Sequence, residues 1–238
     1  MRQGAQGLTI AVTPGQVYTA NVIDREGDLT VDSHGNISGQ IRIVMSGQSA
    51  LYWRQAALEE DADEVKKQFD RGLNAMVPNG VEAHVSHFLG MNQPDVNLLA
   101  IVNVKGILGA PTAKLLLLPG FFFETRGNVP FAKEAKRLTP VDMKYADSVV
   151  NEITYELPQG MTVEGAPQDA TNLWKGHAIY VTKTTKGAGE ITISRTLESA
   201  FTFAKASEYQ DLRGFYQKVA TTDQQDMVLT GATAGKGD

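Results

Sequence analysis

The chain has 238 residues, of which 42% are hydrophobic and 21% are charged, and its formal net charge is −5. These values are ordinary for globular proteins, and the length allows one large domain or two domains of about 100–150 residues each. No cluster of Lys and Arg accompanies the acidic balance, so we predict no nucleic-acid partner. The chain contains no cysteine, which excludes thiol nucleophiles, Cys-ligated metals and disulfides.

The longest apolar runs are Leu115–Leu118 and Phe121–Phe123. Both are far too short to cross a bilayer, so we expect no transmembrane segment. Residues 1–7 contain no apolar stretch long enough for a signal peptide. The protein is therefore either cytoplasmic or a piece whose export signal lies elsewhere.

The first half of the chain alternates between strand and helix patterns. Period-two alternation predicts a short strand around 18–23, another around Leu29 and Val31, and a strand whose buried face carries Ile37, Ile41, Ile43 and Met45. Two helices follow over 46–58 and 61–76, the second with Asp61 and Glu64 as a capping box. Strands are expected again at 81–89, at 97–104 as a central strand, and at 115–118 next to that strand.

The second half repeats the β pattern. Alternation predicts a strand over 149–157 and a hairpin from 179 to 197 that turns at Lys186–Gly189. One helix begins at Ser207, and its apolar stripe consists of Leu212, Phe215, Tyr216 and Val219. We expect this helix to lie across the hairpin residues Ile179, Val181, Ile191 and Ile193, with a last strand at 227–229.

The fold class that follows is mainly β (α+β), with two β-sandwich-like domains. The first domain, 1–123, contains the helix pair as an insertion, and the second, 143–230, ends with the single helix. Residues 119–140 contain three prolines and two glycines, which places an interdomain crossing at 124–142. The Gly- and Ala-rich residues 231–238 form an expected disordered tail.

The polar residues that could bind a metal or take part in catalysis are better explained by ordinary structural roles. His84 and His87 lie three residues apart in a predicted strand, so they should point to opposite faces, and we predict no metal site and no cofactor. An oxygen-rich run and a group of carboxylates are better explained by turns and a solvent-facing strand. The run contains Asp24, Glu26, Asp28, Asp32 and Asn36; the carboxylates are Glu152, Glu156 and Glu164.

Aromatic residues are the remaining candidates. In an extended chain Phe121, Phe122 and Phe123 cannot all face one core, so one of them is available to a second surface. Together with Trp53 and Trp174 they form the candidate interdomain or partner surface. Packing between domains is favoured over an external partner.

Several strings resemble the C-terminal region of bacterial transglutaminase-like proteins. These strings are Pro119–Glu124 (PGFFFE), Arg137–Asp142 (RLTPVD), Leu157–Gly160 (LPQG) and Tyr209–Val219 (YxxLRxFYxxV). Members of that family carry an N-terminal β domain, a papain-like core with a Cys-His-Asp triad, and β-rich modules. The resemblance implies an exported or envelope-linked bacterial protein, and no triad residue can be carried over because the thiol does not exist here.

The expected function is a non-catalytic accessory region that supports or positions a transglutaminase-like domain, which would be its partner. One alternative is a free-standing binding module for an envelope glycan or peptide, for which exposed aromatics on one sheet face would be evidence. Another alternative is a stand-alone hydrolase built on Asp, Glu and His, for which a cluster of perturbed titratable groups in a pocket would be evidence.

Overall fold

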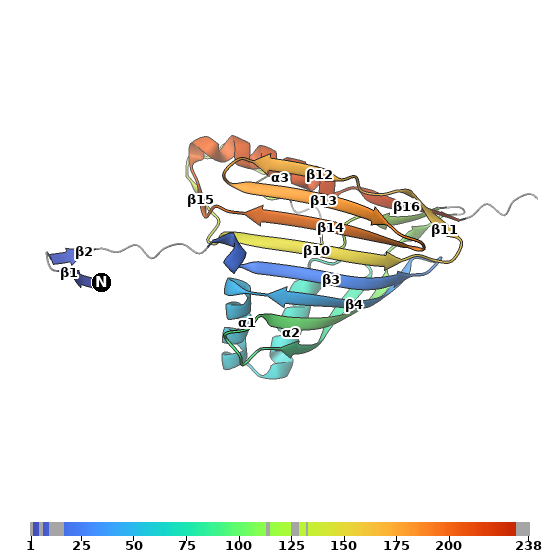
Figure 1. Ribbon diagram of the computed structural model, residues 1–238, viewed down its shortest axis with the longest axis horizontal. Coiled ribbons are helices and arrows are strands. Elements are labelled where there is room, and N and C mark those ends of the chain that lie inside the picture. Colours follow the sequence, from blue (N-terminus) through green and yellow to red (C-terminus); the bar gives the residue numbers. More distant parts are fainter. Residues whose placement is uncertain are drawn as a thin grey trace, which may run out of the picture.

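The structure is a computed structural model that describes residues 17–112, 115–124, 129–131 and 133–231, together with the backbone of 2–4 and 7–9. The largest element is an eight-stranded sheet in the order β12-β13-β14-β10-β3-β4-β6-β5 (Figure 1). Its strands are β3 (Val22–Val31), β4 (Asn36–Met45), β5 (Val81–Leu89), β6 (Leu98–Ile107), β10 (Asp147–Glu156), β12 (Ala170–Trp174), β13 (Ala178–Lys186) and β14 (Glu190–Ser199).

Strand β10 joins the two halves of the chain by pairing in parallel with β3, from Ser148 opposite Val22 to Glu156 opposite Thr30. The start of this pair is fastened by Asn21, whose Nδ2 donates to the Ala146 carbonyl at 2.8 Å. The sheet thus takes four strands from each side of the predicted crossing at 124–142. The observed fold differs from the expected pair of β-sandwich-like domains, because the two halves of the chain share one sheet. The predicted fold class, mainly β (α+β), is confirmed.

A second, four-stranded sheet has the order β11-β16-β8-β7. It consists of β7 (Ala110–Pro111), β8 (Leu115–Pro119), β11 (Met161–Gly165) and β16 (Asp226–Gly231). The prediction that 115–118 pairs with the strand at 97–104 is therefore wrong, because β8 pairs with β16 and β7 instead. Two small pairs complete the strands: β1 (Arg2–Gly4) with β2 (Gly7–Thr9), and β9 (Val141–Asp142) with β15 (Phe203–Ala204).

Strand β3 is one strand of ten residues rather than two short ones. Its odd-numbered residues from Arg25 to Val31 are buried, and Glu26, Asp28 and Thr30 are exposed. The polar residues that suggested a break therefore lie on the solvent side of a continuous strand. The expected strand at 18–23 is replaced by the 3-10 helix η1 (Tyr18–Ala20) before β3 begins.

One face of the eight-stranded sheet carries all of the packing. Helices α1 (Gly47–Glu59) and α2 (Ala62–Asn74) and the four-stranded sheet contribute to one core with β3, β4, β6, β10 and β14. The Asp61 side chain accepts a hydrogen bond from the Glu64 N–H, as the predicted cap requires, and Val65, Phe69 and Leu73 are buried. The opposite face, which we call the uncovered face because no other described helix or strand packs on it, is largely polar but also carries Ile101, Ile179 and Val181.

Helix α3 (Tyr209–Asp223) follows the short 3-10 helix η2 (Ala206–Glu208) and closes a second core with β12 and β13. Its predicted stripe is buried, which confirms that the stripe is core. The sheet residues beneath it are Ala178 and Tyr180 rather than Ile179 and Val181. The register of β13 puts Ile179 and Val181 on the other face, since successive side chains alternate.

None of the described helices is long and apolar enough to cross a membrane. The predicted tail 231–238 lies outside the described residues except for Gly231.

Candidate binding cleft

A cavity of about 390 Å³ lies on the packed face of the eight-stranded sheet, between the end of α2 and α3. Its lining includes Arg25 from β3, Val149 from β10, and Arg195 and Leu197 from β14. Residues just after α2 and along α3 line it as well, as do Phe123, Glu124, Val129 and Pro130. The cavity therefore lies where the two halves of the chain meet.

Arg25 is the most unusual residue of this cleft, because only 7% of its surface is exposed. Its Nη1 donates to Asn151 Oδ1 at 3.1 Å, its Nη2 lies 3.8 Å from the Met76 sulfur, and its guanidinium lies 4.6 Å from the centre of the Phe123 ring. Among the described residues, no carboxylate lies within 4 Å of it. Burial lowers the pKa of Arg25 to about 10, an effect that Glu124 opposes and the like charge of Arg195 reinforces.

Arg195 is equally buried, at 4% exposed, but it is fully paired. Its Nε and Nη2 donate to Asp223 Oδ1 and Oδ2 at 2.8 and 2.9 Å, and Glu124 lies 3.6 Å from Nη1. The Tyr180 hydroxyl also donates to Asp223 Oδ1, at 2.7 Å. Burial alone would lower the pKa of Arg195, but the hydrogen bonds and charges of these carboxylates raise it. The network ties α3 to β13 and β14.

A second cavity, of about 480 Å³, adjoins the first and shares Arg25 and Met76 with it. Its lining is mainly apolar and comes from β3, β4, α1 and α2. These apolar residues are Ile23, Ile43, Met45, Trp53, Phe69 and Leu73. The first cavity is lined by charged groups and the second is mainly apolar, and we call the two cavities together, on either side of the Arg25 and Met76 side chains that they share, the Arg25 cleft.

The predicted aromatic surface is divided by the structure. Phe121, Phe122 and Phe123 are all buried, because the chain turns at these residues instead of running extended and all three reach one core. Trp53 is half-buried on α1, where it packs edge-to-face on Phe69 and lines the Arg25 cleft. Trp174 belongs to the other core and stacks on His177 with ring centres 4.1 Å apart.

His84 and His87 were expected on opposite faces of their strand, and the structure overturns this. A bulge at Ser86 shifts the register, so His84 pairs with Asn103 and His87 with Ile101, which lie on the same, uncovered face. In the described part of the chain, no group of three or more His, Cys, Asp or Glu is arranged to hold a metal.

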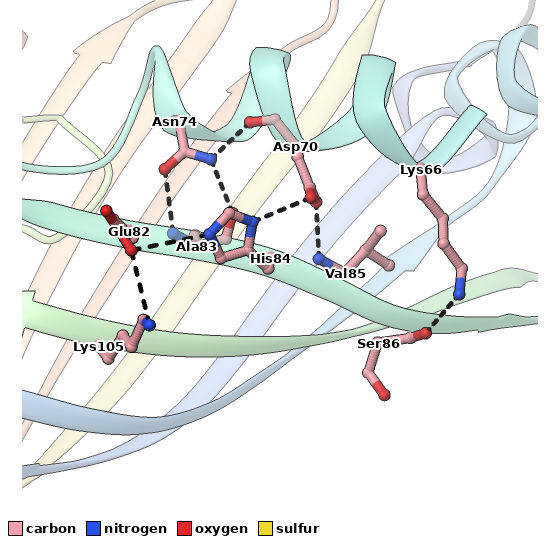
Figure 2. A network of polar contacts seen from close by, with 9 residues as sticks. All are labelled: Lys66, Asp70, Asn74, Glu82, Ala83, His84, Val85, Ser86 and Lys105. Carbon is pink, nitrogen blue, oxygen red and sulfur yellow. Dashed lines mark hydrogen bonds and ion pairs between the residues drawn. The ribbon is translucent and has the colours of Figure 1, made fainter. Parts of the chain in front are cut away.

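Figure 2 shows instead that His84 belongs to a contact between α2 and β5. Asp70 accepts a hydrogen bond from the Val85 N–H at 2.7 Å and contacts His84 Nδ1 at 3.1 Å. Asn74 accepts from the Ala83 N–H at 3.0 Å and donates to the Ala83 carbonyl at 2.7 Å. These side chains satisfy the free backbone edge of the last strand of the sheet, which would otherwise be open to pairing with another chain.

The carboxylate candidates lie on the uncovered face or in turns, except Glu164, which is exposed on β11 of the four-stranded sheet. Asp32 accepts hydrogen bonds from the His34 and Asn36 N–H groups, which is the predicted turn. Glu152 accepts from Ser194, and Glu156 accepts from Thr30, across neighbouring strands. No Phe, Tyr or Trp lies on the uncovered face of the eight-stranded sheet, all of whose strands are described.

Sequence reasoning missed both arginines of the cleft, although a signal was present. Arg25 and Arg195 each stand at an inward-facing position in the alternation of their strands. Each lies two residues after an isoleucine of the same face, Ile23 and Ile193 respectively. A charged residue at such a position is rare unless it is paired or functional. An inward-facing arginine in an otherwise apolar alternation is therefore the sequence signal for this cleft.

Residues 113–229 match a family described as a domain of unknown function with a solved structure (DUF3858). The match begins next to β8 and ends in β16, so it includes the second half of the large sheet and α3 but not β3 to β6. A crystal structure of a "putative protease" from Parabacteroides distasonis ATCC 8503 is similar at 14% identity and a TM-score of 0.40. The similarity covers 50% of this chain and 24% of that one, so the chain spans about a quarter of its length. No curated protein matches the sequence.

Proposed function

We propose that this chain is a non-catalytic accessory module that supports or positions a transglutaminase-like catalytic domain. The strings that resemble the C-terminal region of those proteins, between Pro119 and Val219, all lie inside the residues that match the family of unknown function. The same resemblance implies an exported or envelope-linked bacterial protein.

The observation that carries the non-catalytic part is the way Asp223 is held in the cleft. Both of its oxygens accept hydrogen bonds from Arg195, and one also accepts from Tyr180. A general base must instead have a free oxygen within reach of the proton that it removes. Asp70, the acid next to His84, likewise has both oxygens engaged with β5. These ionisable groups stabilise the fold, and the chain has no cysteine to act as the nucleophile of a transglutaminase.

The first experiment measures turnover by the purified chain. Amide hydrolysis and transamidation of glutamine peptides should stay at the level of buffer, and iodoacetamide should change nothing. Turnover above buffer that disappears in Asp223→Asn or His84→Gln would overturn the non-catalytic assignment.

The second experiment tests the accessory role. We expect the chain to bind, in calorimetry, a transglutaminase-like domain encoded in the same reading frame or beside it, and to raise the melting temperature of that domain. A gene neighbourhood without such a domain, or a domain that neither binds nor is stabilised, would overturn it.

A binding module for an envelope peptide is the second candidate, and the Arg25 cleft is the observation that favours it. Ligand sites are typically cavities of about 300–1,000 Å³ with an apolar lining and a few polar groups. Exposed Phe, Tyr or Trp side chains on one sheet face would favour a glycan ligand, and none is found on the described strands of the uncovered face.

A further inference from the structure

We propose that the Arg25 cleft binds a ligand with a carboxylate next to an apolar group. The carboxylate pairs with the Arg25 guanidinium, and the apolar group fills the adjoining cavity under α1 and α2. The inference goes beyond the accessory role and does not depend on it, because it concerns described residues of this chain alone.

The first argument is the missing counter-charge of Arg25. A buried guanidinium is normally paired with a carboxylate, because an unpaired charge loses its hydration without compensation. Among the described residues, the hydrogen-bond partners of Arg25 are the neutral Asn151 amide and Met76 thioether. Its planar fork of donors suits a carboxylate that binds through both oxygens.

The second argument is that the carboxylates already in the cleft are engaged elsewhere. Asp223 binds Arg195 through both oxygens, and Glu124 lies within ion-pair distance of Arg195, at 3.6 Å, but not of Arg25. Within the described part of the chain, Arg195 thus has two acidic partners and Arg25 has none. An anion from outside the chain is the group that would correct this imbalance.

The third argument is the shape and lining of the adjoining cavity. Arg25 and Met76 line both cavities, so a ligand carboxylate that pairs with Arg25 would lie beside the apolar cavity. Gly72 of α2 lines that cavity too, and a side chain added there would meet nothing within 4 Å. Glycine is unfavourable inside a helix, and at this position it leaves the cavity open.

The first measurement uses N-acetyl-L-phenylalanine as the probe, with binding followed by calorimetry and by amide shifts in NMR. N-acetyl-L-phenylalaninamide has the same shape without the charge, and N-acetylglycine has the charge without the ring. We expect the acid to bind about tenfold or more tightly than either, since a charge-assisted pair and apolar burial are both needed. Equal affinity for acid and amide, or no saturable binding of the acid, would overturn the proposal.

The variants locate the site. Arg25→Met should abolish the preference for N-acetyl-L-phenylalanine over its amide. Gly72→Leu should weaken the binding of N-acetyl-L-phenylalanine, because the leucine side chain would fill the apolar cavity. The matched control is Arg42→Met, which removes the same charge from the uncovered face, where Arg42 pairs with Glu26, and should leave the affinity unchanged. All three must retain the near-UV circular dichroism of the wild type. An unchanged affinity in Arg25→Met, or an equal loss in Arg42→Met, would contradict the assignment.

Such a ligand could be the C-terminal end of a peptide or a free fatty acid. N-acetyl-Ala-Phe represents the first source and octanoate the second. Both carry the same chemistry, so binding of either that requires Arg25 supports the proposal, and the tighter one identifies the source. Binding of either that persists in Arg25→Met would count against it.

Discussion

Arg195 on β14 and Asp223 at the end of α3 form a two-bond ion pair, with Nε to Oδ1 at 2.8 Å and Nη2 to Oδ2 at 2.9 Å. Both side chains are nine-tenths buried or more. The pair connects the last helix to β14, whereas Arg25 on β3 is as deeply buried without an acidic partner among the described residues. The two arginines should therefore respond in opposite ways to removal of their charge.

We predict that Arg195→Met lowers the free energy of unfolding by about 3–5 kcal/mol, because it leaves the Asp223 carboxylate buried and unpaired. Arg25→Met should be neutral or stabilising, because it replaces a buried charge that has no partner by an apolar side chain of similar length. Urea unfolding followed by circular dichroism measures both. A larger loss in Arg25→Met than in Arg195→Met would contradict the assignment of partners.

The apolar stripe of α3 gives a second prediction. Phe215 is buried in the core shared by α3 and β13, so Phe215→Ala should cost about 3–5 kcal/mol by leaving a cavity. In a chain of this size the melting temperature should fall by roughly 6–20 °C. Lys218→Ala, an exposed position on the same helix, is the control and should change it little. An unchanged melting temperature in Phe215→Ala would mean that α3 does not close this core.

The edge strand β5, which α2 protects, gives a third prediction. Asp70→Ala removes the acceptor of the Val85 N–H, and an edge hydrogen bond lost in this way costs about 1–3 kcal/mol. The exposed edge of β5 should also promote association, which sedimentation velocity would detect. Lys67→Ala, at an exposed site on the same helix, should change neither property. A variant with the sedimentation coefficient and the stability of the wild type would show that α2 does not protect this edge.

The eight-stranded sheet that the two halves share gives a fourth prediction, which also tests the predicted domain boundary. We expect limited proteolysis to cut first within 124–142 or after residue 230. The two large fragments should then stay together in gel filtration, because β3 and β10 are paired along their length. Fragments that separate without denaturant and keep their own circular dichroism would establish two independent domains.

A fifth prediction concerns the pH dependence of stability and rests on Asp24, on the uncovered face. Burial raises the pKa of Asp24, and the charges of Glu26 and Glu152 raise it further, against the opposing charge of Arg42. The protonated form of Asp24 is therefore favoured by folding, and the stability it contributes is complete below its unfolded pKa and is lost as the pH rises through the folded pKa.

Asp24→Asn should accordingly melt higher than the wild type at pH 7 and no higher at about pH 3, below the unfolded pKa of aspartate. The gain should be no more than about 0.5 kcal/mol, because the group is partly exposed. Salt should reduce the difference by screening the acidic neighbours. A gain that is the same at both pH values would show that ionisation of Asp24 is not its cause.

Local pattern is sufficient for most elements of this protein. Alternation in 37–45 and the four-residue spacing of Val65, Phe69 and Leu73 depend on a chain segment meeting one core, so they can be read without the rest of the fold. The same is true of the Asp61 cap and of the α3 stripe. The absence of cysteine excludes thiol chemistry whatever fold the chain adopts.

The tertiary structure alone decides what these elements build. Parallel pairing of β3 with β10 joins residues more than 120 positions apart, and no local pattern encodes such a partner. The turn at Phe121–Phe123 and the bulge at Ser86 each redirect side chains that an extended strand would have sent elsewhere. The Arg25 cleft exists because β3, β14, α2 and α3 converge there. The local sequence determines which residue faces inward along one strand, but whether an inward arginine has a partner depends on packing between distant segments.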